Sequence, residues 1–118
     1  DDFYDDRGAS FSPDGKKIVF SSDRTQYGKD WCYNLFIYDL ETDLIYYLTT
    51  GSYQDNTPVW SPDGKYIAFT SDRDSCYNIW IADLSGIFVQ SFLAASGTWV
   101  VAAFFITRIR KVEPSPNS

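Results

Sequence analysis

The sequence predicts an all-β protein built from two copies of one repeat unit. The turn sequence Ser-Pro-Asp-Gly-Lys occurs at residues 12–16 and again at residues 61–65, which is 49 residues later. An Asn-led apolar run follows each turn, at residues 34–40 and 78–84, and these runs are 44 residues apart. A period in the forties with several strands per copy is typical of β-propeller blades. We therefore expect two four-stranded blades, an incomplete propeller, plus a partial or degenerate third element.

Each copy is expected to begin with a short strand, at residues 9–12 and 57–61, that leads into the Ser-Pro-Asp-Gly turn. Proline sets φ at the second turn position, aspartate accepts bonds from nearby N–H groups, and glycine tolerates a positive φ. These properties predict a structural role for the turn residues, which are Pro13, Asp14 and Gly15 in the first copy and Pro62, Asp63 and Gly64 in the second.

The second strand of each copy, at residues 17–22 and 66–71, is expected to pair back as a hairpin partner. The Asn-led third strand is apolar on both faces, so it must be covered on both sides, as it is between adjacent blades. A fourth strand fits residues 44–49, and residues 87–93 are its weaker counterpart in the second copy.

The repeats are expected to fill residues 1–86, with blades at about residues 8–49 and 57–93. Residues 84–107 contain no charged side chain, and 16 of these 24 positions are apolar. We interpret residues 87–111 as a divergent apolar segment and residues 112–118 as a disordered tail.

Three interpretations of the apolar segment remain open. It is the start of a third blade, with strands at residues 99–101 and 103–106, or an end that is not native to the fold. Otherwise it is a membrane segment, since about 20 apolar residues span a bilayer and Arg108, Arg110 and Lys111 form a positive flank. Polar side chains within the segment, such as Gln90, make this last possibility less favoured.

An Asp-Arg pair follows the second strand in both copies, as Asp23–Arg24 and as Asp72–Arg73. Identical placement favours a structural role, because a ligand site would break the repeat symmetry. We expect each aspartate to accept loop N–H bonds and each arginine to pack over an aromatic ring. The alternatives are a charged site repeated around a ring and a calcium site at residues 72–74, but the ligand series of an EF-hand is absent.

The first copy carries five extra residues before its Asn-led strand. Asymmetric loops on a rigid scaffold are frequent binding surfaces, so the candidate binding residues are Tyr27, Lys29 and Trp31. Simple variation in loop length is the alternative.

Composition excludes several classes of function. The formal net charge is −6, which argues against a nucleic-acid partner, because phosphate binding needs a Lys/Arg surface. The chain contains no histidine, so neither a Ser-His-Asp or Cys-His relay nor a His-ligated zinc site can be assembled from it. We predict no catalytic residue, no metal and no cofactor.

The two cysteines, Cys32 and Cys76, occupy matching positions of the two copies. Equivalent points on packed sheets lie about 10 Å apart, whereas a disulfide needs Cα atoms closer than about 7 Å. We expect two free, partly buried thiols, with a disulfide or a metal pair as the alternatives.

The pattern Pro-x-Trp-Ser-Pro-Asp-Gly-Lys-x-Ile-Ala-Phe, then Ser-Asp-Arg, then Asn-Ile-Trp-x-x-Asp-Leu resembles the WD40-like repeat of TolB-type β-propellers. Similar repeats occur in the propeller domains of prolyl-oligopeptidase and dipeptidyl-peptidase-type enzymes. The resemblance covers residues 8 to about 86 and implies a periplasmic or extracellular setting. Because the matching residues belong to the scaffold, the resemblance is specific for fold and not for function.

The resemblance implies a non-catalytic binding module, a platform for protein–protein interaction. The alternative is a fragment of the substrate-gating propeller of a serine peptidase whose catalytic domain is absent from this chain. A repeat fragment without function is a third possibility. Two blades leave apolar flanks open, so we expect association with a protein partner or with additional blades. Head-to-tail copies that complete a ring are one form of such association.

Overall fold

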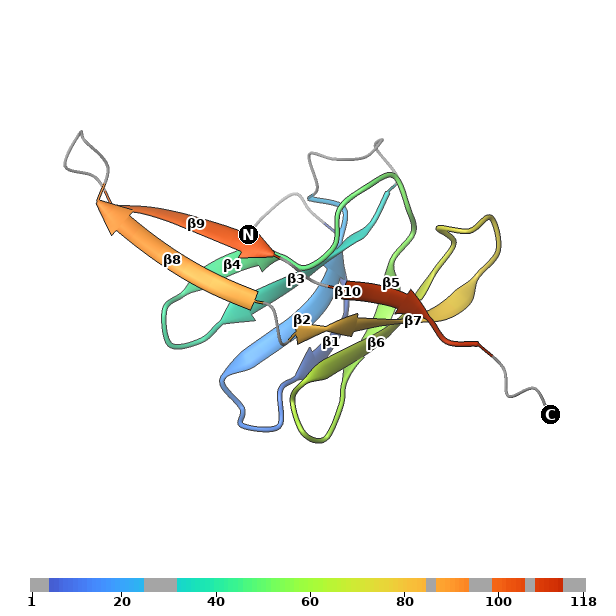
Figure 1. The fold of residues 1–118 in the computed structure, drawn as a ribbon, viewed down its shortest axis with the longest axis horizontal. Coiled ribbons are helices and arrows are strands. Elements are labelled where there is room, and N and C mark those ends of the chain that lie inside the picture. Colours follow the sequence, from blue (N-terminus) through green and yellow to red (C-terminus); the bar gives the residue numbers. More distant parts are fainter. Residues whose placement is uncertain (1–4, 25–31, 85–86, 94–98, 106–107, 114–118) are drawn as a thin grey trace.

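The computed structural model describes residues 5–24, 32–84, 87–93, 99–105 and 108–113. The protein is all-β, as the repeats predict, and Figure 1 shows the strands in two main sheets. The strands are β1 (Asp6–Phe11), β2 (Lys17–Ser22), β3 (Asn34–Asp39), β4 (Leu44–Tyr47), β5 (Asn56–Trp60), β6 (Tyr66–Ser71), β7 (Asn78–Asp83), β8 (Ile87–Leu93), β9 (Trp99–Phe105) and β10 (Arg108–Lys111).

The two main sheets are four-stranded and antiparallel, and each corresponds to one sequence repeat. The first blade has the order β1-β2-β3-β4, and the second has the order β5-β6-β7-β10. The register of the central strands is the same in both, since Phe20 pairs with Phe36 and Phe69 pairs with Trp80. The predicted fold class, two propeller blades of an incomplete propeller, is therefore confirmed.

The fourth strand of the second blade is β10, and not residues 87–93 as the sequence suggested. Arg108 pairs with Asp83 and Lys111 pairs with Trp80. Strand β8 pairs instead with β9 in a separate two-stranded sheet, and β9 is continuous where two short strands were expected. The segment at residues 94–98 contains Ser and Gly between two β-prone runs of seven residues, which favours local hairpin pairing over pairing with β7.

In Figure 1 the far end of the β8–β9 hairpin lies away from both blades. A helix of the length and apolarity required to cross a membrane is absent from the part of the chain that the structure describes.

The core lies between the two blades, which pack face to face. Phe69 and Ile67 of the second blade are almost completely buried, as is Leu35 of the first. The other buried members of this cluster are Val19, Ile37, Tyr46 and Leu48 from the first blade and Ala82 from the second. Each blade thus uses one apolar face for this contact and has a second face directed away from it.

Both blades bend at the same place in their first strand. The register shifts in a bulge between Arg7 and Ser10, and again between Asn56 and Val59. Gly8 adopts a φ of 60° in the first bulge, and Thr57, at the equivalent position, adopts a φ of 50°. A positive φ is uncommon for a β-branched residue, so the second bulge holds a strained residue where the first holds glycine.

Both cysteines are free, as predicted, but their burial differs. Cys32 is buried, whereas Cys76 is exposed rather than partly buried. The residue after Cys32, Tyr33, forms an isolated bridge with Gln54, so the link to the second blade lies against this segment. Among the described residues, no later segment takes the equivalent place beside Cys76.

Candidate functional site

The candidate binding residues Tyr27, Lys29 and Trp31 lie outside the described residues. The described chain stops at Arg24, after the end of β2, and resumes at Cys32, before the start of β3. The Asp-Arg pair, Asp23 and Arg24, is the last described part of the chain before this gap.

The aspartate of each Asp-Arg pair binds backbone in the preceding segment. Asp23 Oδ1 accepts a hydrogen bond from the N–H of Asp5 at 2.8 Å, and Asp72 Oδ1 accepts one from the N–H of Gln54 at 2.8 Å. Each aspartate therefore ties the entry of its blade to the end of the second strand.

The arginine of each pair covers aromatic rings of its own blade. The Arg24 guanidinium lies 5.3 Å from the ring centroid of Phe20, and that of Arg73 lies 5.3 Å from the centroid of Phe69. Arg73 also lies over Tyr53 and over Trp80. Such contacts combine cation–π attraction with packing.

Asp55 is the centre of a buried polar network between the blades. Its carboxylate pairs with Arg73 of the second blade, at 3.0 Å from Nη2 to Oδ1. Two donors of the first blade also bind Oδ2: Thr49 Oγ1 at 2.7 Å and Asn34 Nδ2 at 3.4 Å. Ser21 Oγ donates to the Asp55 carbonyl at 2.6 Å, and the Asp55 N–H donates to the carbonyl of Tyr33 at 3.0 Å. One buried carboxylate therefore joins both blades.

Asp6 occupies the same position in the first copy, 49 residues earlier, but only half of the network is present. Arg24 Nη2 lies 2.7 Å from Asp6 Oδ2, so the ion pair with the arginine is conserved between the copies. The Asp6 side chain is 38% exposed, whereas that of Asp55 is fully buried. The described residues provide no counterpart of the Thr49 hydroxyl or the Asn34 amide beside Asp6. The missing donors are those that a preceding blade supplies in the second copy.

The face of the first blade around Asp6 is open, and we call it the upstream flank. It consists of Asp6, Phe11, Ile18 and Tyr38, which are exposed or partly exposed, and of Phe20, which is buried beneath the Arg24 guanidinium. Phe11 is 62% exposed, whereas its counterpart Trp60 is partly buried and donates from Nε1 to the carbonyl of Ser10 in the first blade at 3.0 Å. A hollow of about 250 Å³ lies here, lined by Asp6, Arg7, Gly8, Ala9, Ile18, Phe20 and Tyr38.

The opposite face of the second blade is open too, and we call it the downstream flank. It consists of Ala68, Ile79, Ile81, Arg110 and Val112. Ile79 is 54% exposed, whereas its counterpart in the first blade, Leu35, is fully buried. The two flanks are thus the two faces left uncovered on either side of the inter-blade core.

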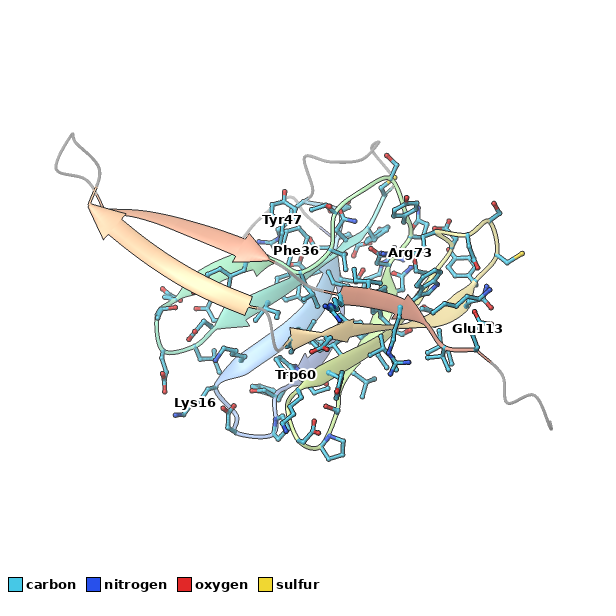
Figure 2. All side chains as sticks on the ribbon, viewed as in Figure 1. Lys16, Phe36, Tyr47, Trp60, Arg73 and Glu113 are labelled. Carbon is cyan, nitrogen blue, oxygen red and sulfur yellow. The ribbon has the colours of Figure 1, made fainter. Side chains whose placement is uncertain are left out.

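A second hollow, of about 340 Å³, lies between the blades at the end that carries the Ser-Pro-Asp-Gly turns. Its lining includes the aromatic residues Tyr46 and Trp60 and the carboxylates of Asp14, Asp39 and Asp63. Figure 2 shows Trp60 and Arg73 towards opposite ends of the second blade. The hollow is therefore separate from the Asp55 network.

The turn aspartates are held as anions by the turn itself. The Ser12 hydroxyl donates to Asp14 Oδ1 at 2.6 Å and lowers the pKa of that carboxyl, and the N–H of Lys16 adds to this effect. The Ser61 hydroxyl lowers the pKa of Asp63 in the same way, also at 2.6 Å. These carboxylates accept hydrogen bonds within their own turns, so their role is to stabilise the turns.

The described residues offer few groups for metal binding or catalysis. No cluster of three or more potential metal ligands among His, Cys, Asp and Glu occurs within them. The Asp5 carboxyl has a lowered pKa because Arg7 and Tyr33 donate to it, at 2.8 Å and 2.9 Å. This exposed cluster lies beside the Asp6–Arg24 pair and gives the edge of the upstream flank a mixed charge.

Asp6 and Asp55 are functional candidates that the sequence did not predict. A signal for them exists, because both precede the first strand of their copy at the 49-residue offset. Extending the repeat alignment a few residues before Gly8 would have found the pair. Asn34 recurs in the second copy as Asn78, but the sequence gives no sign that Asn34 or Thr49 meets Asp55, because only folding brings these residues together.

Comparison with known proteins supports this architecture. The family described as the dipeptidyl peptidase IV (DPP IV) N-terminal region matches residues 3–98. A solved structure described as a TolB from Agrobacterium tumefaciens is similar with 21% sequence identity and a TM-score of 0.59, over 89% of this chain and 44% of that chain. The TolB of Acinetobacter baumannii is similar with 24% identity and a TM-score of 0.54, over 92% of this chain and 32% of that chain.

The chain therefore spans less than half the length of either TolB structure, and at these identities the similarity is one of fold. No curated protein matches this chain.

Proposed function

This chain belongs to the family of dipeptidyl peptidase IV N-terminal regions, and from that premise we propose that it is a non-catalytic binding module for protein partners. The upstream flank is the surface that binds. The observation that carries this proposal is the contrast between Asp6 and Asp55, because the same surface is covered in the second blade and open in the first.

The apolar part of the upstream flank supports the same conclusion. Phe11 is largely exposed, and the hollow beside Ile18 and Phe20 lies next to it. Burial of apolar surface drives most protein association, and exposed aromatic groups beside a hollow are frequent anchors. A β-rich partner that packs here would bury the face of the first blade that is equivalent to the second-blade face covered in the observed interface.

A second candidate function follows from the family match. The chain is then part of the substrate-gating propeller domain of a serine peptidase, and the partner is further propeller sequence of the same protein. In both cases the chain itself supplies no catalytic group, and we propose a setting outside the cytoplasm for it. The two candidates differ in whether the partner is a separate polypeptide.

Two variants with equal starting exposure test the binding function. Phe11 and Tyr77 are each 62% exposed, and Tyr77 lies in the loop before β7, apart from the upstream flank. We expect Phe11→Lys to lose a partner that the wild-type chain captures from an extract and then binds as a purified protein in calorimetry. Tyr77→Lys should retain it. Equal binding by both variants would contradict the proposal.

An activity screen of the purified chain completes the test. We expect no turnover of peptide, ester or glycoside substrates. Turnover that survives purification and disappears on replacement of a single carboxylate would show that the chain is an enzyme.

A further inference from the structure

The hollow between the blades at the Ser-Pro-Asp-Gly turns is a cavity that the proposed function does not use. We call it the turn-end hollow. Its volume of about 340 Å³ is within the range of small-molecule sites. Both blades contribute apolar lining, with Ile37 and Tyr46 from the first blade and Trp60 and Leu84 from the second. Figure 2 shows Trp60 at this end of the second blade.

The apolar lining of the turn-end hollow is held in place by the fold. Trp60 donates from Nε1 to the carbonyl of Ser10 at 3.0 Å, which fixes its ring across the boundary between the blades. Ile37 and Tyr46 are paired in the first sheet, and both are buried in the core cluster. A site whose groups are already ordered loses little conformational entropy on binding. The hollow is therefore preformed for a ligand.

Asp39 is the polar group of this hollow with capacity left for a ligand. Its side chain is only 14% exposed, and its Oδ1 accepts the N–H groups of Glu41 at 2.9 Å and Thr42 at 3.3 Å. Lys17 Nζ lies 3.9 Å from Oδ2, which is longer than a hydrogen bond, and the Lys17 side chain is 40% exposed. A donor placed closer than Lys17 therefore gains a hydrogen bond to a largely buried carboxylate.

Two further carboxylates make the turn-end hollow acidic. Asp14 and Asp63 line it from the two turns, and the bonds that they receive from neighbouring residues end on Oδ1 of each. The serine donors lower the pKa of both carboxyl groups, so both are ionised at neutral pH. Among the described lining residues, these three carboxylates face one cation, Lys17. The hollow therefore opposes an anionic ligand and favours a cation.

An organic cation fits this lining better than a metal ion does. In the described part of the chain, no three carboxylates come together closely enough to hold a metal. A guanidinium is planar, spreads its charge over several N–H donors and stacks on aromatic rings such as those of Tyr46 and Trp60. An aliphatic stem beside it would bury apolar surface against Ile37 and Leu84.

The lining of the turn-end hollow breaks the symmetry of the repeat. Tyr66 replaces Lys17 at the 49-residue offset, and Arg110 replaces Tyr46 in the pairing register. A purely structural feature of the repeat would use the same residues in each copy. The side chains that surround Asp39 are instead particular to this one position, as expected of a ligand site.

We propose that the turn-end hollow binds a guanidinium group carried on an aliphatic stem, as in an arginine side chain or a free guanidino compound. The guanidinium donates to Asp39 Oδ2 in place of Lys17. The rings of Tyr46 and Trp60 lie against it, and the stem packs on the apolar lining. This site is separate from the upstream flank, so the inference goes beyond the proposed function and stands or falls without it.

Titration of the full chain, followed by two-dimensional NMR of its N–H groups, tests the site. The probes are Nα-acetylarginine amide and its citrulline counterpart, which has nearly the same shape and no charge. We expect the arginine probe to bind with a dissociation constant on the order of 1 mM and to shift the indole signal of Trp60. The citrulline probe should bind at least about tenfold more weakly. Equal binding of the two probes, or an unshifted Trp60 signal, would overturn the proposal.

Three variants assign the role of Asp39. Asp39→Asn keeps an oxygen for the turn N–H groups but removes the charge, so it should bind the arginine probe at least about tenfold more weakly. The matched control is Asp43→Asn, which makes the same change in net charge at an exposed residue outside the lining and should bind as the wild type does. Lys17→Gln removes the competing cation and should bind about threefold more tightly. Equal affinities of the two aspartate variants, or a Lys17 variant that binds no more tightly than the wild type, would contradict the proposal.

A third probe distinguishes the two sources of the guanidinium. Butylguanidinium has the aliphatic stem and lacks the peptide groups of Nα-acetylarginine amide. Tighter binding of Nα-acetylarginine amide would identify an arginine within a peptide as the ligand, whereas tighter binding of butylguanidinium would identify a free guanidino compound. Either result supports the site, and failure of both probes to bind would overturn it.

Discussion

Thr49 and Asp55 are joined by a 2.7 Å hydrogen bond from Oγ1 to Oδ2 across the boundary between the two blades. The same hydroxyl oxygen accepts the N–H of Leu35 at 2.9 Å. A single side chain at the end of the first blade therefore satisfies one buried donor of its own blade and one carboxylate at the entry of the next. Both side chains are buried, so neither bond can be replaced by bulk water.

Thr49→Val should destabilise the protein by about 1–3 kcal/mol, because it keeps the side-chain volume, leaves the buried N–H of Leu35 without its partner and removes one donor to the buried Asp55 carboxylate. The free energy of unfolding in urea, followed by tryptophan fluorescence, measures this loss. Thr50 is exposed and provides the matched control. Thr50→Val should change the free energy by less than about 0.5 kcal/mol. A Thr49 variant as stable as the Thr50 variant would argue that the bond contributes nothing.

Thr57→Gly should stabilise the protein slightly, by up to about 1 kcal/mol. The φ of 50° strains a β-branched residue, and glycine removes the strain at a smaller cost in chain entropy. The reverse change at the equivalent bulge, Gly8→Thr, should destabilise by about 1–2 kcal/mol. Space is not the obstacle there, since an added Cβ at Gly8 meets nothing nearer than 3.5 Å. Thermal unfolding gives the sign of each change, and a less stable Thr57→Gly variant together with a Gly8→Thr variant as stable as the wild type would refute the strain.

The turn aspartates should make stability fall in acid. The pKa of Asp14 and that of Asp63 lie below the ordinary value of 3.8 in the folded protein, because Ser12 and Ser61 donate to them. Because folding lowers the pKa of these carboxyl groups, their contribution to the free energy of unfolding is complete at pH values above the pKa of the unfolded chain. It is lost as the pH falls below 3.8 and through the folded pKa.

The double variant Asp14→Asn, Asp63→Asn should therefore flatten the pH dependence of unfolding below pH 3.8 and should be less stable than the wild type at neutral pH, where the ionised carboxylates contribute in full. Replacing the two serine donors with alanine should partly flatten it in the same region, because the largest cause of the lowered pKa is then removed while the backbone donors of Lys16 and Lys65 remain. An unchanged acid slope in both variants would show that the turns do not hold these carboxyl groups as anions.

The strands and turns could be predicted from the sequence because their determinants are local. The Ser-Pro-Asp-Gly turn carries its own hydrogen bonds, from the N–H of Gly15 to the carbonyl of Ser12 at 2.9 Å and from that of Gly64 to Ser61 at 3.0 Å. Repetition, at offsets of 49 residues for the turns and 44 residues for the Asn-led strands, then located the remaining strands of both copies up to residue 84.

Features that depend on distant segments were missed. Strand β10 reads Arg-Ile-Arg-Lys, which has little apolar signature, and it follows β7 only after the whole β8–β9 hairpin. The Asp55 network draws Asn34, Thr49 and Arg73 from three separate segments. Nothing in the local pattern around any one of them predicts that they meet, because the packing of the two blades brings them together.

The most direct test of this account compares Asp55→Asn with Asp6→Asn in equilibrium unfolding. The two aspartates are paired with equivalent arginines, and they differ in whether a blade covers them. Breaking the buried pair at Asp55 should cost about 3–5 kcal/mol, whereas the exposed pair at Asp6 should contribute less than about 1 kcal/mol. That asymmetry is the result expected if the first blade presents an open flank. Equal losses at the two positions would contradict it, since they would mean that Asp6 is covered as Asp55 is.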